Sequence, residues 1–102
     1  MDALDRYPIP DPGVIGRIVE TNVPGVNEAV LVLPEQGKLK VLNDVGARIW
    51  SLVDGKRTIR QIAAEISMEY AISTMQAESD AHIFIDSLVQ KGICRLDDRP
   101  TR

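Results

Sequence analysis

The segment from Leu42 to Ala63 constrains the fold more than any other part of the chain. It begins at the end of an alternating strand, where Asn43 has a side chain that can cap the first turn of a helix. Asp54-Gly55 then predicts a tight turn. Thr58 and Gln61 have the spacing of a capping box that starts a second helix. A strand that leads directly into two short capped helices predicts a mixed domain whose helices pack on a sheet.

Three strands are predicted before these helices. They run from Val14 to near Asn22, from Glu28 to Leu33 and from Lys38 to Leu42, and Pro24-Gly25 and Glu35-Gln36-Gly37 make the turns between them. Charged and apolar residues alternate in the third strand, so one face is expected to pack on the core while the other meets solvent.

Apolar stripes at helical spacing define the buried faces of three helices. They consist of Val45, Ile49, Leu52 and Val53 in the first helix, Ile59, Ile62, Ala63 and Ile66 in the second, and Ala77, Ala81, Phe84, Ile85 and Leu88 in the third. Ser73 and Gln76 predict a second capping box at the start of the third helix, and Gly92 ends it. The predicted core includes Val32, Val41, Ile49, Leu52, Ile62, Ile66, Phe84 and Leu88. Ile93 to Leu96 could form a small terminal strand.

The predicted fold class is therefore α+β and winged-helix-like, with a three-stranded antiparallel sheet followed by three helices. A chain of 102 residues is long enough for one core. Residues 1–13 contain Pro8, Pro10 and Pro12, which predict a flexible or loosely docked arm. The folded domain is expected over residues 14–96, with a frayed tail at residues 97–102.

The residue types exclude most kinds of catalytic or metal site. The single cysteine, Cys94, rules out an internal disulfide, and the lone His82 has no partner residues with metal-ligand spacing. Phosphate-binding loops and nucleophile motifs are absent from the sequence. We therefore expect no cofactor, no metal and no enzymatic activity. No apolar run approaches the roughly 20 residues that a bilayer requires, which predicts a cytoplasmic protein with no membrane partner.

A winged helix raises the alternative of a transcriptional regulator that binds DNA. The net charge of −3 and the acidic third helix, with Glu78, Asp80 and Asp86 against Lys91, argue against nucleic acid. A basic cluster does occur around the first turn, where a solvated helix face is the ordinary explanation. It consists of Arg48, Lys56, Arg57 and Arg60. A structural or assembly subunit remains a third possibility.

A binding function is favoured if the third strand lies at the edge of the sheet. The backbone groups of Lys38 to Leu42 would then be unpaired, and an extended peptide could add as another strand. Lys38 and Lys40 also suit an edge that only needs protection from unwanted self-pairing. Both interpretations remain open on the pattern alone.

The order and spacing of these features resemble the PqqD-like family, also called RiPP recognition elements. The resemblance extends from about Val14 to Leu96. The matching residues are Arg17, Val30 to Glu35, Leu42-Asn43, Gly46-Ala47, Ile49-Trp50, Asp54-Gly55, Ile59, Ile62-Ala63, Tyr70, Phe84-Ile85, Leu88 and Gly92-Ile93.

The resemblance implies a non-catalytic peptide chaperone of natural product biosynthesis. Such a protein binds the leader segment of a ribosomally synthesised precursor peptide as an added strand and presents it to a separate enzyme. The implied partners are the precursor and a radical, ATP-grasp or cyclase-type enzyme or a leader protease, with a homodimer possible.

The resemblance also implies a groove between the third strand and the third helix. One wall would consist of Lys38, Leu39, Lys40, Val41 and Leu42, and the opposite wall of Glu78, Ala81, His82 and Ile85. Core positions are the alternative for Leu39 and Val41. Ala81 and Ile85 would be shared between core and groove.

Overall fold

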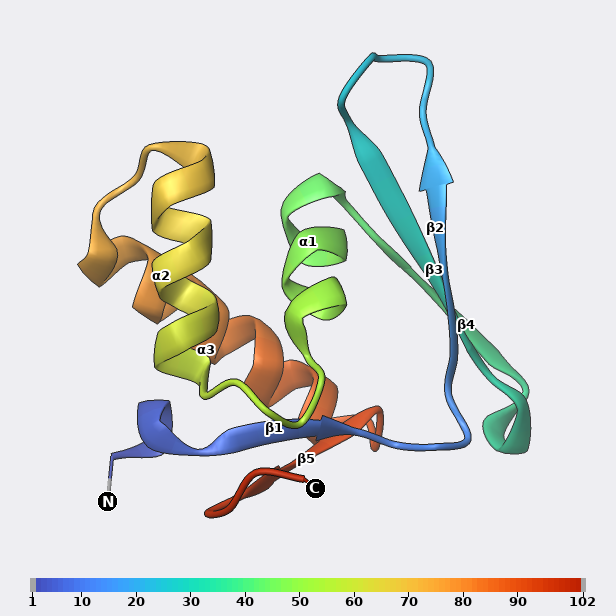
Figure 1. Ribbon diagram of the computed structural model, residues 1–102. Helices are drawn as coiled ribbons and strands as arrows, with labels where there is room; N and C mark the ends of the chain where they lie inside the picture. Colours follow the sequence, from blue (N-terminus) through green and yellow to red (C-terminus); the bar gives the residue numbers. More distant parts are fainter. Residues whose placement is uncertain (1, 102) are drawn as a thin grey trace.

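The computed structural model describes residues 2–101 and consists of a helical layer on one face of a three-stranded sheet, with a two-stranded sheet at its base (Figure 1). The strands are β1 (Tyr7–Pro10), β2 (Ile15–Glu20), β3 (Asn27–Leu33), β4 (Lys38–Leu42) and β5 (Cys94–Asp97). The helices are α1 (Asp44–Leu52), α2 (Ile59–Tyr70) and α3 (Thr74–Gln90), with short 3-10 turns η1 (Ala3–Asp5) and η2 (Pro34–Gln36). The predicted α+β class, with a three-stranded antiparallel sheet and three helices, is confirmed.

The helices begin where their capping residues predict. The Asn43 side chain accepts from the Gly46 N–H at 2.8 Å, and the capping box of Thr58 and Gln61 is complete. The box predicted at α3 is only half formed. Ser73 accepts from the backbone N–H of Gln76 at 3.1 Å, but the Gln76 side chain donates to Asp80 instead.

The core lies between the three-stranded sheet and the helices. Strand β3 supplies Ala29, Leu31 and Leu33, which are buried against α1, while α2 and α3 pack on each other beside it. The predicted core residues Ile49, Leu52, Ile62, Ile66 and Leu88 are buried. Val32 and Phe84 are only half-buried.

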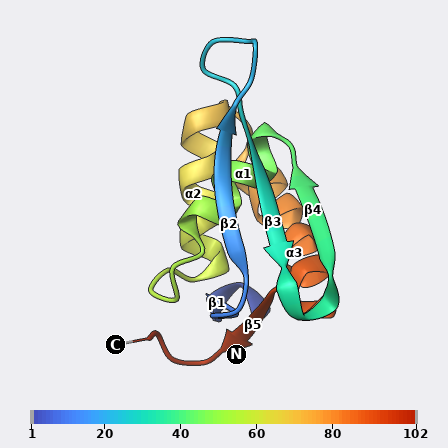
Figure 2. The same ribbon diagram turned by 90° about the vertical axis from the view of Figure 1, so that its right-hand side faces the viewer.

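The predicted burial of Val41 is wrong. Its side chain is 63% exposed, and that of Leu39 is 69% exposed. In the β3–β4 register, Lys40 pairs with the buried Leu31, and alternate residues of a strand face opposite sides. Lys38 and Lys40 are therefore on the helix-facing side of β4, while Leu39 and Val41 are on the outer side. Figure 2 shows that the helices lie behind the sheet and leave its outer face uncovered.

The flexible arm and the frayed tail that we predicted are also corrected by the structure. Residues 7–10 form β1, which pairs with β5, and Pro8 and Ile9 are buried. Within residues 2–101, β1 pairs with β5 alone, and prolines are tolerated in edge strands whose N–H groups need no partner. Asp97 belongs to β5, and the Thr101 N–H donates to the Gly55 carbonyl at 2.8 Å. Both ends of the described chain are thus held by the fold.

Candidate functional site

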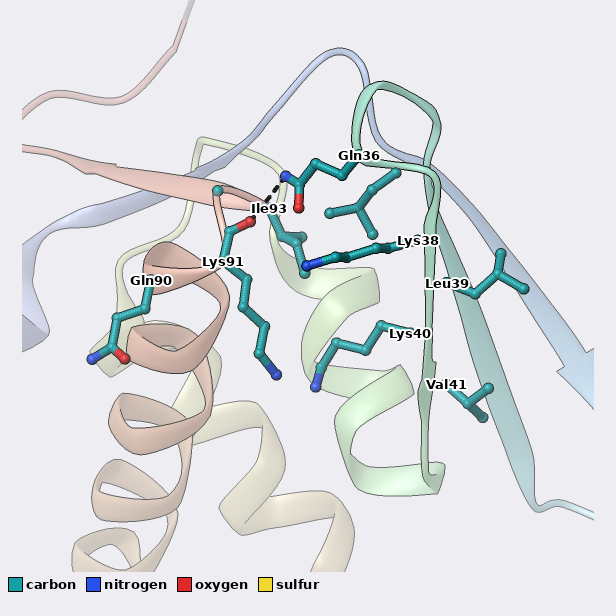
Figure 3. A pocket seen from close by; sticks show the side chains of 10 residues that line it. Gln36, Lys38, Leu39, Lys40, Val41, Gln90, Lys91 and Ile93 are labelled. Carbon is teal, nitrogen blue, oxygen red and sulfur yellow. Dashed lines mark hydrogen bonds between the residues drawn. The ribbon is translucent and has the colours of Figure 1, made fainter.

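An open groove of about 870 Å³ lies between β4 and the C-terminal end of α3 (Figure 3). We call it the β4 groove. It is lined by Leu33, Gln36, Lys38, Leu39, Lys40, Val41, Gln90, Lys91, Gly92 and Ile93. One end is closed by a hydrogen bond of 3.3 Å from the Gln36 side chain to the Lys91 carbonyl. The groove therefore has a strand for one wall and a helix terminus for the other.

The backbone of β4 forms a free edge along this groove. In the sheet order β2-β3-β4, the described part of the chain pairs β4 with β3 alone. Because successive residues of an antiparallel strand direct their backbone groups to opposite sides, alternate residues of β4 present N–H and C=O groups away from β3. An extended segment in the groove could pair with these groups.

Three lysine side chains give the groove its charge. Figure 3 shows Lys38 and Lys40 extending from β4 toward α3, and Lys91 extending from the end of α3 toward Lys40. The side chains of Leu39 and Val41 point to the other side of β4, so these two residues border the groove without directing their side chains into it. Lys91 follows α3 as its C-cap residue, where a cation is favourable beside the last helical carbonyls.

Lys91 affects the ionisation of Lys40. The facing Lys91 amine lowers the pKa of Lys40, and partial burial and the positive charge of Lys91 act in the same direction. None of the ion pairs among residues 2–101 includes Lys38, Lys40 or Lys91. The lining residues include no Asp or Glu either.

The structure brings together one of the two walls that the family resemblance implied. Four of the five β4 residues line the groove, while the fifth, Leu42, is buried. On α3, Ala81 and Ile85 are fully buried in the core, and Glu78 is ion-paired with Arg60 of α2 at 3.1 Å. His82 is exposed but is not among the lining residues.

Gln90 at the end of α3 and Lys91, its C-cap residue, line the groove but were not predicted from the sequence. A signal for Lys91 was present. It follows Leu88 by three residues and Phe84 by seven, so it continues one stripe of the helix surface. Extending that stripe past the last apolar residue would have identified it.

A second cavity of about 350 Å³, which we call the β2 cavity, lies between β2 and the helices α1 and α2. It is lined by Ile18, Gly25, Asn27, Asp44, Ala47, Arg48, Ser51, Glu69 and Tyr70. Arg48 donates to Glu69 through Nε and Nη2 at 2.8 and 2.6 Å, and the Tyr70 hydroxyl donates to Asp44 at 3.0 Å. Its charged groups therefore have partners within the chain.

The predicted basic cluster around the first turn is likewise largely paired. Arg57 contacts Asp54 at 2.7 Å, and Arg60 contacts Asp2, Asp5 and Glu78. Guanidinium groups held by carboxylates are not available to neutralise phosphates. The solvated, structural interpretation of this cluster fits the structure better than a DNA-binding surface.

The remaining reactive groups do not form a site. Within residues 2–101, no three His, Cys, Asp or Glu side chains gather in a group that could hold a metal ion. Burial raises the pKa of the Cys94 thiol to about 11, which disfavours the reactive thiolate. No helix in the same residues is long and apolar enough to cross a membrane. The β4 groove is thus the feature with the clearest capacity to bind a partner.

Comparison with known sequences gives matches over about two thirds of the chain. A family model for coenzyme PQQ synthesis protein D (PqqD) matches residues 28–93, which include nearly all of β3, together with β4 and the three helices. Proteins described as PqqA binding protein, from Xanthomonas euvesicatoria pv. vesicatoria (strain 85-10) and Xanthomonas axonopodis pv. citri (strain 306), are each 34% identical to this chain over 67 residues. The aligned region is 66% of this chain and 71% of each relative.

Two solved structures are similar in fold. TbiB1 in complex with the TbiA(beta) leader peptide has a TM-score of 0.70 and 25% identity, covering 85% of this chain and 94% of TbiB1. The PqqD truncation of Methylobacterium extorquens PqqCD has a TM-score of 0.71 and 29% identity, covering 92% and 93%. That truncation is described as a functional, stand-alone recognition element for ribosomally synthesised and post-translationally modified peptides.

Proposed function

Because this chain belongs to the PqqD family, we propose that it binds the leader segment of a ribosomally synthesised precursor peptide and presents it to a modifying enzyme. The observation that carries the proposal is the free edge of β4 beside a groove of about 870 Å³. The names of the relatives support it, since one solved neighbour holds a leader peptide and the curated relatives are called PqqA binding proteins.

The binding mode that we propose is strand addition at β4. Backbone hydrogen bonds to an extended peptide supply affinity that is independent of sequence, and side chains on alternate positions supply specificity. One row of peptide side chains would lie on the same side as Lys38 and Lys40, facing α3. The other row would lie beside Leu39 and Val41 on the outer face of the sheet.

A role in binding without chemistry agrees with the groups that line the groove. Lysine, glutamine and aliphatic side chains hold no nucleophile paired with a base. We therefore assign the chemical steps to a separate partner, such as a radical, ATP-grasp or cyclase-type enzyme or a leader protease. We place this action in the cytoplasm, where ribosomal precursors are made. A homodimer and binding by a single copy are both compatible with the proposal.

An NMR titration tests the proposal directly. The neighbouring reading frames would first be searched for a short precursor, and synthetic peptides that tile it would be added to the labelled protein. We expect the amide resonances of Lys38 to Leu42 and Gln90 to Ile93 to shift together, because both segments border the groove. Shifts confined to Arg48, Lys56 and Arg60 would exclude this edge as the peptide-binding site. Binding to duplex DNA at submicromolar concentration would favour the regulator.

A pair of proline variants tests strand addition itself. Neighbouring residues of β4 direct their N–H groups to opposite sides, so only one of Lys40 and Val41 can donate to the peptide. We expect one of Lys40→Pro and Val41→Pro to weaken peptide binding at least tenfold while the β3–β4 pairing persists, since proline removes that donor. Lys40→Ala and Val41→Ala keep both backbones and serve as controls for the lost side chains. Normal binding by both folded proline variants would exclude backbone pairing at this edge.

A further inference from the structure

The β4 groove contains positive charge that the described fold does not neutralise. Lys40 and Lys91 approach from opposite walls, and Figure 3 shows their ammonium groups directed at one another. Lys38 lies on the same side of β4 as Lys40. Like charges that meet across a cavity repel each other, so the free protein is not at its electrostatic optimum here.

Purely structural roles do not account for this arrangement. A lysine on an edge strand can discourage self-pairing, and a lysine after a helix can favour its last carbonyls. Neither role requires the two side chains to converge on one point. Lys40 is also less exposed than its neighbours Leu39 and Val41, because its side chain extends over the groove rather than into open solvent.

Most arginines of the described chain are ion-paired, although Arg17, Lys56 and Arg99, which also lie outside the groove, are not. Five arginines each contact at least one carboxylate. They are Arg6, Arg48, Arg57, Arg60 and Arg95. The whole chain carries a net charge of −3, so carboxylates are abundant, yet none lines the β4 groove. The groove is a local cationic site in an acidic protein.

We propose that the peptide bound in the β4 groove carries an aspartate or glutamate at the position that faces Lys40, and that Lys40 and Lys91 hold this carboxylate between them. The inference rests on the proposed function, because it names the chemistry of the peptide that adds to β4. Opposite charges at facing positions of paired strands attract each other. A carboxylate between two ammonium groups also removes their mutual repulsion, so its contribution is specific to the bound state.

The surrounding charge limits how acidic the peptide is. A strongly acidic segment would be repelled by a protein of net charge −3, whereas one carboxylate can enter a groove with three lysines. The site therefore selects a peptide that has one acidic side chain at the position facing Lys40, rather than several acidic residues in succession. In this way it would set which residue of the leader lies beside Lys40.

A selection experiment tests this without knowledge of the natural leader. A display library of random 16-residue peptides would be selected on the wild-type protein, on Lys40→Glu and on Arg17→Glu. The last variant changes the net charge equally but lies on β2, away from the groove. We expect Asp or Glu to be enriched at one position with the wild type and Arg17→Glu, and Lys or Arg at that position with Lys40→Glu.

A synthetic peptide from the wild-type pool then measures the effect. Replacing its acidic residue by the matching amide should weaken binding to the wild type about tenfold, within the range of close charge pairs at interfaces. The same replacement should change binding to a Lys40→Gln, Lys91→Gln double variant less than twofold. Each variant is first checked for folding by its NMR spectrum.

The outcomes separate the inference from the proposed function. If the selected peptides shift the resonances of Lys38 to Leu42 but show no acidic preference, the inference is overturned and strand addition stands. If no selected peptide affects these resonances, both are overturned, because no segment would then pair with β4.

Discussion

The β4 groove and the β2 cavity border the same sheet but arrange their charges in opposite ways. In the β2 cavity, Arg48 is paired with Glu69, and Tyr70 with Asp44. In the β4 groove, Lys40 faces Lys91, and no acidic residue lines the walls. Charged groups that already have partners within the chain are neutralised by the fold, whereas the facing cations of the β4 groove could be neutralised by a ligand of opposite charge. The difference indicates which of the two sites is built to receive a partner.

The largest effect is expected from the core that supports both sites. Ile85 is fully buried in α3, so Ile85→Ala should lower the free energy of unfolding by about 2 to 5 kcal/mol through lost burial and the cavity left behind. Urea denaturation measures it. The matched variant His82→Ala, on the exposed side of the same helix, should change stability by less than about 0.5 kcal/mol. Equal effects of the two variants would mean that α3 is not anchored through Ile85.

A steric change beneath β2 should affect stability and spare binding. A Cβ atom at Gly16 would lie 2.6 Å from Trp50 Nε1 and 3.2 Å from Leu31 Cδ2. We expect Gly16→Val to destabilise the protein by about 1 to 3 kcal/mol, as overpacking does. The folded variant should still bind peptide at β4 with unchanged affinity. Val19→Ala, on the outer face of the same strand, controls for effects on β2 in general. A Gly16→Val protein that is folded but unable to bind would show that the two edges are coupled.

Removing one cation from each site should have opposite effects on the free protein. Arg48 and Glu69 are 39% and 36% exposed, so Arg48→Ala should lower stability by no more than about 1 kcal/mol. Lys40→Ala removes a like-charge contact and should leave stability unchanged or raise it by a few tenths of a kcal/mol, as for like charges on a surface. Parallel thermal and urea denaturation would compare them. A clear loss of stability in Lys40→Ala would show that this lysine has a stabilising partner.

The smallest expected effect is a pH dependence that only the β2 cavity should show. The bidentate contact with Arg48 holds the pKa of Glu69 below its ordinary value of 4.5. A lowered pKa in the folded state adds stability that is complete above pH 4.5 and is lost as the pH falls through the lowered value. The stability difference between wild type and Glu69→Gln should therefore shrink below pH 4.5. The difference for Lys40→Gln should stay constant there, because lysine remains charged. A stability difference for Glu69→Gln that did not change with pH would mean that the contact with Arg48 does not lower the pKa of Glu69.

Local signals in the sequence predicted the elements well. The side chains of Asn43 and Thr58 accept hydrogen bonds from N–H groups in the first turn of the helix that follows, and this capping depends only on local sequence. Helices α1 and α2 therefore begin where they were expected. The sequence also indicated a strand near Ile93 to Leu96, close to the observed β5. Its partner could not be predicted, because β1 lies more than 80 residues earlier in the chain and contains prolines that usually argue against a strand.

The errors at the groove arose from an ambiguity that alternation cannot resolve. The pattern Lys38 to Leu42 shows that two faces differ, but not which face the helices cover. We assigned the apolar residues to the core, whereas β4 extends past the core and uses its lysines on the helix-facing side. Glu78 was placed in the opposite wall on the basis of the family resemblance. Its ion pair with Arg60 could be found only once the packing of α2 on α3 was known.

The pairing of β1 with β5 also has a mechanical consequence. Because Tyr7 lies opposite Asp97 in an antiparallel pair, the two chain ends leave this small sheet on the same side. A force that pulls the ends apart would first break the Thr101–Gly55 hydrogen bond. It would then open the β1–β5 residue pairs one after another, beginning with Tyr7 and Asp97. Sequential opening offers little resistance compared with shearing all the bonds at once. A load on the termini would therefore peel β1 away while the three-stranded sheet and the β4 groove remained intact.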